Sequence, residues 1–263
     1  MTENNKPAVL VTGGTSGIGL AIAKAYAIQN YDVVVTCNQE NKNEDKLSKL
    51  FSGENLILPL IVKSDVSVDN DVIDLMEIIK ANTGEIDVFI SCANNECPVR
   101  SIDDYIEEDF LNSLDSSTWP LVNIPKQMKK ILGRYPRYVI GLSSDVTDRF
   151  MPDYDFLAAN KHIMEILVRY LNHHFYSEGT IFNIIRTQPI LAGVLTADQN
   201  RNIAGNPEKY DLEALALTPD EFAKTVVMLT SGLMDSIRGQ TINADRGFSF
   251  AAGIFGLYNV NLS

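Results

Sequence analysis

Short runs of apolar residues alternate along the chain with longer segments in which apolar residues recur every three or four positions. The first pattern predicts buried β-strands, and the second predicts helices that pack against them. Regular alternation of the two favours an α/β fold, a doubly wound parallel sheet (Rossmann-like) in a single domain. The strands are expected at residues 8–11, 32–37, 56–62, 86–91, 138–142, 180–185 and 240–244.

The same periodicity places the helices between these strands. Residues 111–132 predict one long helix despite Pro120 and Pro125, and Trp119 within it is expected to be buried. The remaining helices are expected at residues 20–28, 46–51, 68–82, 154–176 and 219–230.

Two segments near the end of the chain do not fit this alternation. Residues 192–217 carry little apolar periodicity, so a lid or substrate loop is expected over about residues 190–218. An apolar tail, Phe248–Leu262, continues past the last predicted strand. Because an exposed apolar tail of this size is unusual in a monomer, we expect it to pack at a subunit interface or over the mouth of the site.

A glycine-rich turn, Thr-Gly-Gly-Thr-Ser-Gly-Ile-Gly at residues 12–19, joins the first predicted strand to the first predicted helix. Such a turn forms a phosphate site, because the free N–H groups and the partial positive charge of the helix start meet there. Gly13 allows backbone angles that side chains forbid, Gly17 allows close approach of a pyrophosphate, and Gly19 allows close packing of helix and strand. The predicted contacts of a dinucleotide are Gly13, Thr15, Ser16, Gly17, Ile18 and Gly19.

Charge and cysteine content exclude several kinds of partner. The formal net charge of -12 argues against nucleic acid or an anionic membrane as partner. Cys37, Cys92 and Cys97 form no even set and lack the spacing of a zinc site, so we expect reduced thiols, no metal and a cytoplasmic location. The N-terminal residues lack the apolar segment of a signal peptide, and no apolar run reaches the length of a membrane span.

One basic cluster consists of Lys126, Lys129, Lys130, Arg134 and Arg137. Docking of an acidic acyl carrier protein is one interpretation. The cluster ends a predicted helix and precedes a predicted strand, which places it opposite the ligand crevice of a doubly wound sheet. Cations also suit a helix C-terminus. A structural role is therefore favoured.

The Thr-Gly-x-x-x-Gly-x-Gly spacing of residues 12–19 resembles the short-chain dehydrogenase/reductase family. The segment Arg238–Gly247, with its Arg-Gly-Gln-Thr strand and later Asp-Arg-Gly turn, is similar as well. Asp65-Val66 follows the third predicted strand, where the family contacts the adenine ring of the cofactor. The residues that this resemblance adds to the expected cofactor site are Asp65, Val66, Ala93, Lys161 and Ile190.

The cofactor's ribose is expected at the end of the second predicted strand. An acidic residue there would bind the 2′-hydroxyl of NADH and repel a 2′-phosphate, and an arginine would favour NADPH. Residues 36–39 contain neither. Asn38 and Gln39 can donate to a phosphate and Lys42 lies near, so NADPH is favoured and NADH is the alternative.

The candidate catalytic residues are Tyr154, Lys161 and Ser144. The family's usual Tyr-x-x-x-Lys motif is not complete, because Leu157 stands four residues before Lys161. Tyr154 stands seven residues before it, and this Tyr-x6-Lys arrangement resembles the NADPH-dependent bacterial enoyl-acyl-carrier-protein reductases. Four and seven residues return to the same helix face, so the phenol moves roughly 4.5 Å farther along the axis.

This resemblance implies an NAD(P)H-dependent reductase of an enoyl thioester in fatty-acid-like or specialised metabolite biosynthesis. Hydride would reach C3, and negative charge would develop on the more distant thioester oxygen. Lys161 would bind the nicotinamide ribose, Tyr154 would stabilise and help protonate the enolate, and Ser144 would be a second donor. The implied partners are a small-molecule or acyl-thioester substrate, free or carried on an acyl carrier protein, and further copies of the chain in a homodimer or homotetramer.

Three departures from the family pattern leave other functions open. Ser91–Asn94 stands where the family has Asn-Asn-Ala-Gly, Asp115 stands at the asparagine of the usual proton relay, and Thr187-Gln188-Pro189 replaces the Pro-Gly after the sixth strand. A carbonyl or dienoyl reductase of the same fold, and a non-catalytic dinucleotide-binding protein, are therefore the alternatives.

Overall fold

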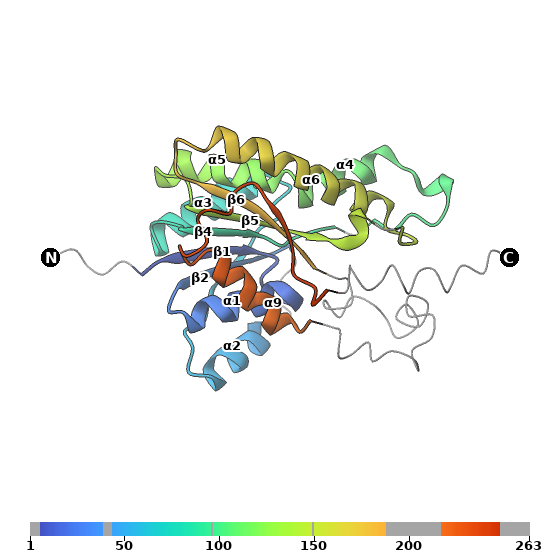
Figure 1. The fold of residues 1–263 in the computed structure, drawn as a ribbon. Helices are drawn as coiled ribbons and strands as arrows, with labels where there is room; N and C mark the ends of the chain where they lie inside the picture. Colours follow the sequence, from blue (N-terminus) through green and yellow to red (C-terminus); the bar gives the residue numbers. More distant parts are fainter. Residues whose placement is uncertain (1–5, 39–43, 96, 149, 188–216, 248–263) are drawn as a thin grey trace.

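Seven parallel strands form one sheet in the computed structural model, which describes residues 6–38, 44–95, 97–148, 150–187 and 217–247. Their order is β3-β2-β1-β4-β5-β6-β7 (Figure 1), which confirms the predicted doubly wound fold. The strands are β1 Ala8–Thr12, β2 Asp32–Cys37, β3 Leu60–Lys63, β4 Val88–Ser91, β5 Tyr138–Ser144, β6 Ile181–Thr187 and β7 Thr241–Asn243.

Helices cover both faces of the sheet (Figure 1). Helices α1, α2 and α9 lie on one face, and α3, α4, α5 and α6 lie on the other. The α-helices are α1 Gly17–Ile28, α2 Glu44–Gly53, α3 Asp69–Asn82, α4 Glu107–Ser117, α5 Pro120–Leu132, α6 Asp155–His174 and α9 Pro219–Leu229. Two short 3₁₀ turns are η1 Ile102–Asp104 and η2 Asp145–Thr147.

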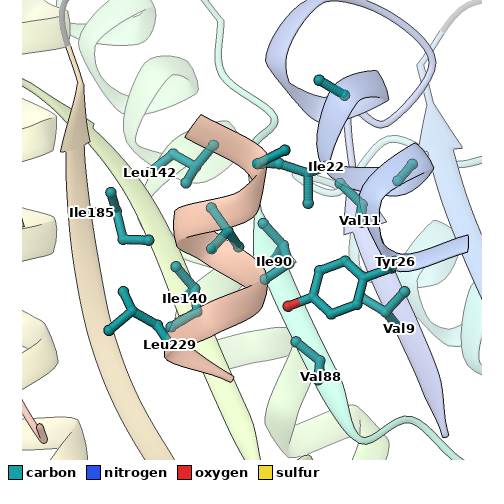
Figure 2. Close-up of a cluster of buried hydrophobic side chains, with 14 of the residues drawn as sticks. Val9, Val11, Ile22, Tyr26, Val88, Ile90, Ile140, Leu142, Ile185 and Leu229 are labelled. Carbon is teal, nitrogen blue, oxygen red and sulfur yellow. The ribbon is translucent and has the colours of Figure 1, made fainter. Parts of the chain in front are cut away.

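The central strands β1, β4 and β5 are buried on both faces, which explains their largely apolar sequences. Figure 2 shows one face, where side chains of β1, β4, β5 and β6 meet Ile22 and Tyr26 of α1 and Leu229 of α9. The alternate positions of the same strands, such as Leu10 and Phe89, pack with α3, α5 and α6. The helices therefore hold the central strands from both sides, and the carboxyl ends of these strands form a fixed edge.

The third strand is shorter than predicted. It begins at Leu60 rather than at residue 56, and pairs with β2 from Val34 onward. Pro59 has no N–H to donate to a neighbouring strand. Ile57 and Leu58 are exposed, so these apolar residues do not belong to the core.

The long helix predicted over residues 111–132 is wrong, because the chain forms two helices there. Helix α4 ends at Ser117, and α5 begins at Pro120, the first helical position, where a missing N–H costs nothing. Pro125 is accommodated inside α5. Trp119 lies at the junction and is 43% exposed, so its predicted burial is also wrong.

The basic cluster lies at the end of the sheet opposite the carboxyl ends of the strands. Arg134 pairs with Glu85 at 2.5 Å and with Asp87, immediately before β4, at 2.8 Å. Arg137 pairs with Asp235 at 2.5 Å. These two members of the cluster have carboxylate partners within the chain, as a structural role requires. The predicted lid, except its last two residues, and the predicted tail lie outside the described residues.

Helix α9 begins with a reciprocal cap. The Glu221 N–H donates to Thr218 Oγ1 at 3.3 Å, and the Thr218 N–H donates to Glu221 Oε2 at 3.0 Å. Arg246, in the turn after β7, also pairs with the Glu221 carboxylate. Hydrogen bonds from the Thr218 backbone, and then from its hydroxyl and from Arg246, lower the pKa of Glu221 to about 2.

Replacing Glu221 by glutamine should lower the melting temperature at pH 7, and by less at pH 3. The folded pKa lies below the ordinary value of 4.5, so the stabilisation is present above pH 4.5 and is lost as pH falls toward 2. Thermal unfolding of both proteins at the two pH values measures the difference. Asp220→Asn, in the same helical turn, is the matched control. An equal loss at both pH values would contradict the role of the charge.

Candidate active site

A cavity of about 660 Å³ opens at the carboxyl ends of the central strands. The order in which the chain adds strands to the sheet reverses between the neighbouring strands β1 and β4, which is where ligands bind in doubly wound sheets. The lining residues come from the turn after β1 (Gly13, Thr15, Ser16, Gly17, Ile18, Gly19), the ends of β2 and β3 (Thr36, Cys37, Asn38, Ser64, Asp65, Val66, Ser67), the segment after β4 (Cys92, Ala93, Asn94, Asn95), α4 (Asn112, Ser116), β5 (Leu142, Ser143, Ser144), the start of α6 (Tyr154, Leu157, Lys161) and β6 (Thr187).

The glycine turn has the geometry that its sequence predicts. Gly13 and Gly17 have φ angles of 67° and 53°, in the left-handed region that favours glycine. A Cβ on Gly19 would lie 2.3 Å from the carbonyl oxygen of Gly13, so the helix start packs directly on the turn. Helix α1 begins at Gly17, three residues earlier than predicted, and its first N–H groups therefore border the cavity.

Thr12 links this turn to the segment after β4 by side-chain hydrogen bonds. Its Oγ1 accepts hydrogen bonds from the N–H groups of Cys92 at 3.1 Å and Ala93 at 3.3 Å. A Cβ on Gly13 would lie 3.2 Å from the Cα of Ala93. Close packing against the backbone of Ala93 therefore favours glycine at position 13, and the two segments form one wall of the cavity.

The predicted adenine end of the site lies at the ends of β2 and β3. Asp65 accepts from the N–H of Ser67 at 3.0 Å and from its hydroxyl at 2.6 Å, while the Asp65 N–H donates to Asp71 Oδ2 at 2.9 Å. These bonds fix Asp65 and Val66 at the cavity wall. Asn38 also lines the cavity, whereas Gln39 and Lys42 lie outside the described residues.

Lys161 reaches the cavity from the second turn of α6. The residue is 6% exposed, and its Nζ donates to the carbonyl oxygen of Leu142 in β5 at 2.8 Å. Burial of an ammonium is costly unless it is hydrogen-bonded, so this contact holds the cation at the end of the sheet.

Tyr154 lies just before α6 rather than within it. It is the N-cap residue, with φ of -106° and ψ of 15°, and the helix begins at Asp155. The prediction that residues 154–176 form the helix is corrected to residues 155–174. Tyr154 nevertheless lines the same cavity as Lys161, so the two predicted residues meet at one site.

The segment around Tyr154 is fixed from a second direction. The Val99 N–H donates to the carbonyl oxygen of Asp153 at 3.2 Å, and the Tyr105 hydroxyl donates to Asp155 Oδ1 at 2.5 Å. Asp153 has a φ of 68°, which a short polar side chain tolerates. These contacts hold both neighbours of Tyr154, and so set the direction in which the phenol leaves the backbone.

Ser144 ends β5 beside Thr187, its register partner in β6. Its hydroxyl makes a long hydrogen bond of 3.4 Å to Asp145 Oδ1. Both Ser144 and Thr187 line the cavity. The predicted second donor therefore lies at the same edge as Tyr154 and Lys161.

Helix α4 contributes side chains that the sequence did not predict. Asn112 and Ser116, one turn apart, line the cavity. Asp115, at the position of the family's relay asparagine, is exposed and does not line it. Asp115 therefore does not take the place of the relay asparagine at the cavity. Asn112 and Ser116 are the polar groups of α4 that a ligand would meet.

The thiol of Cys92 is unsuited to nucleophilic chemistry at neutral pH. Burial raises its pKa to about 11, against a smaller opposing effect of the Lys161 charge. The thiolate, which is the reactive form, is then scarce. No cluster of His, Cys, Asp and Glu among the described residues could hold a metal ion, and no helix in that part of the chain is long and apolar enough to cross a membrane.

The predicted site residues line this one cavity, except Ile190, Gln39 and Lys42, which lie outside the described residues. Sequence reasoning missed polar residues such as Thr36, Asn95 and Thr187. Their common signal is a position at or just after the carboxyl end of a strand, which is where a parallel sheet gathers its functional side chains.

Comparison with known proteins identifies relatives of this chain. The family model described as enoyl-(acyl carrier protein) reductase matches residues 13–249. The enoyl-[acyl-carrier-protein] reductase [NADH] of Aquifex aeolicus (strain VF5) is 23% identical over 255 residues, covering 94% of this chain and 92% of that protein.

Solved structures share the fold. The Bacillus cereus enoyl-acyl carrier protein reductase with NADP+ and indole naphthyridinone has a TM-score of 0.77 at 20% identity, covering 95% of this chain and 99% of that chain. A single-substitution variant of the actinorhodin polyketide ketoreductase, with NADPH, has the same TM-score at 19% identity, with the same coverage. The sheet and its helices are thus common to enzymes of more than one activity.

Proposed function

The chain belongs to the enoyl-(acyl carrier protein) reductase family, within the short-chain oxidoreductases, and on that premise we propose that it reduces the C=C bond of an enoyl thioester with NADPH. The observation that carries the proposal is that Tyr154 and Lys161 line the same cavity. Position 157, which lies between them in the sequence, is a buried leucine. A leucine cannot donate a proton, so a reductase using this cavity requires a phenol farther from the lysine.

The cavity suits a nicotinamide dinucleotide. The left-handed angles of Gly13 and Gly17 and the absent Cβ of Gly19 leave backbone N–H groups at the start of α1 open to a pyrophosphate. Asp65 and Val66 follow β3, on one side of the β1–β4 switch point, and Lys161 donates to β5, on the other side. This separation suits an adenosine half and a nicotinamide half. When bound, the cofactor supplies a hydride to the β-carbon of the enoyl group.

Our proposal assigns each catalytic side chain one task. Lys161, held at the cavity by the Leu142 carbonyl, binds the ribose hydroxyls, and its charge stabilises nearby negative charge. Tyr154 donates to the thioester oxygen as the enolate forms, and Ser144 is the second donor at that oxygen. Transfer of the Tyr154 proton to the enolate oxygen would give an enol, and tautomerisation of this enol moves a proton to the α-carbon and completes the saturated acyl thioester. Solvent water would then return a proton to the Tyr154 phenolate.

The choice of NADPH is supported by the end of β2. Asn38 lines the cavity where a carboxylate would repel a 2′-phosphate, and an amide can donate to one. Relatives named above differ on this point, since the Aquifex enzyme is named for NADH and the Bacillus cereus structure contains NADP+. Both cofactors are therefore compared in the assay.

The direct test is reduction of crotonyl and longer enoyl thioesters, carried on coenzyme A or on acyl carrier protein, followed by loss of reduced-cofactor absorbance. We expect turnover that is faster with NADPH than with NADH. No turnover with either cofactor across the chain lengths would contradict the proposal. A product in which C=O is reduced while C=C is intact would assign the chain to carbonyl reduction instead.

A further inference from the structure

A largely buried ion pair joins α6 to β6, one helical turn from Lys161. Glu165, 4% exposed, is one turn after Lys161 on α6. Its Oε1 accepts from Arg186 Nε at 2.7 Å, and its Oε2 accepts from Arg186 Nη2 at 2.5 Å. This two-point geometry is the strongest form of the arginine–carboxylate contact. Arg186 also pairs with Asp148, just after η2.

The same carboxylate is bonded to the end of β5. The buried hydroxyl of Ser143 donates to Glu165 Oε1 at 2.6 Å, while Lys161 Nζ donates to the carbonyl oxygen of the preceding residue, Leu142, at 2.8 Å. Lys161 and Glu165 thus reach consecutive residues of one strand from consecutive turns of one helix. Ser144, the next residue of that strand, lines the cavity.

Without Arg186, the Glu165 carboxylate would attract the Lys161 ammonium away from the cavity. Residues four apart on a helix are neighbours, and a lysine and a glutamate at that spacing attract each other. An uncompensated carboxylate at a buried site is costly and would draw in the nearest cation. With both oxygens of Glu165 engaged by the guanidinium, Lys161 is left at the Leu142 carbonyl, beside the cavity.

We propose that Arg186 is a positioning residue of this active site, which sequesters the Glu165 carboxylate so that the Lys161 ammonium stays at the cavity. The proposal rests on the proposed function of Lys161 as a cofactor ligand. Hydrogen bonding to Glu165 raises the pKa of Arg186, in keeping with a guanidinium committed to this partner.

The test compares Arg186→Met with the double variant Glu165→Gln/Arg186→Met. In the single variant the lone carboxylate captures Lys161, so NADPH affinity, measured by the change in NADPH fluorescence on binding, should fall by about tenfold. Lys161→Ala, which removes the ammonium itself, should show a loss of the same size. In the double variant the competing charge is absent, and affinity should return close to wild type. Arg186→Lys keeps a cation that cannot form the two-point contact, so its affinity should be intermediate.

Arg134→Met is the matched control, because Arg134 also bridges two carboxylates but lies at the opposite end of the sheet. It should leave NADPH affinity unchanged whatever its effect on the melting temperature. Wild-type affinity in Arg186→Met, or a double variant as weak as the single one, would overturn the proposal. The readout needs no acyl substrate, so it stays decisive if enoyl thioesters prove not to be reduced, which would be a failure of the proposed function alone.

Discussion

Tyr154→Phe should lower kcat for the best enoyl thioester by about 10²–10³, the usual loss for one donor at a developing oxyanion. The phenol contacts negative charge that exists mainly in the transition state, so KM and NADPH affinity should change little. Steady-state kinetics, with a fluorescence titration of NADPH, separate the two effects. The ring remains in place at the N-cap of α6, and the helix start is therefore preserved.

Tyr170→Phe is the matched control for this variant. It also removes one tyrosine hydroxyl from α6, but Tyr170 is exposed, lies in the second half of the helix and does not line the cavity. Its kcat should stay near wild type. A tyrosine introduced at position 157 should not rescue Tyr154→Phe, because its hydroxyl would lie one turn nearer Lys161. Wild-type kcat in Tyr154→Phe would remove the main support for enoyl reduction.

Gly19→Ala should weaken NADPH binding by about 10- to 100-fold through a single methyl group. The new Cβ would lie 2.3 Å from the Gly13 carbonyl oxygen, which is backbone and cannot turn aside as a flexible side chain can. The turn must therefore move away from the helix start, and its N–H groups lose their common direction toward the phosphates. Fluorescence titration measures the loss.

Gly53→Ala is the control for Gly19→Ala, since a Cβ on Gly53, the last residue of α2, meets no atom within 4 Å. It makes the same chemical change at the end of a helix and should keep wild-type affinity. If Gly19→Ala bound NADPH as tightly as Gly53→Ala, the phosphate site would have to lie elsewhere.

The fold was predictable because its signals are local. Each central strand is a short apolar run such as Ala8–Thr12, and each glycine at the first turn has a distinct steric task. Errors in helix and strand boundaries arise at proline, which can have two opposite structural roles. Proline can interrupt an element or border one: Pro120 starts the helix in which it was predicted to lie, and Pro59 precedes the strand that was predicted to contain it.

The site was predictable only as far as sequence spacing carries it. Tyr154 and Lys161 are separated by seven residues, so a helical spacing predicted their convergence, although Tyr154 is the N-cap of α6 and not part of the helix. The bond between Glu165 and Arg186 joins residues 21 apart on different elements. It depends on how α6 lies across β6, which no spacing encodes. For the same reason Asn112 and Ser116 could not be distinguished in advance from the exposed Asp115 beside them.

The break between α4 and α5 has a practical consequence for spectroscopy. Trp119 is the only tryptophan of the 263 residues, and the junction leaves its indole 43% exposed. Its intrinsic emission should therefore be red-shifted in the native protein and readily quenched by iodide or acrylamide. The indole does not line the cavity, so this emission reports on whatever covers the outer surface of the helical layer. The emission maximum should therefore be followed as protein concentration is varied, because contacts that cover Trp119 would shift it. Added cofactor should leave it unchanged.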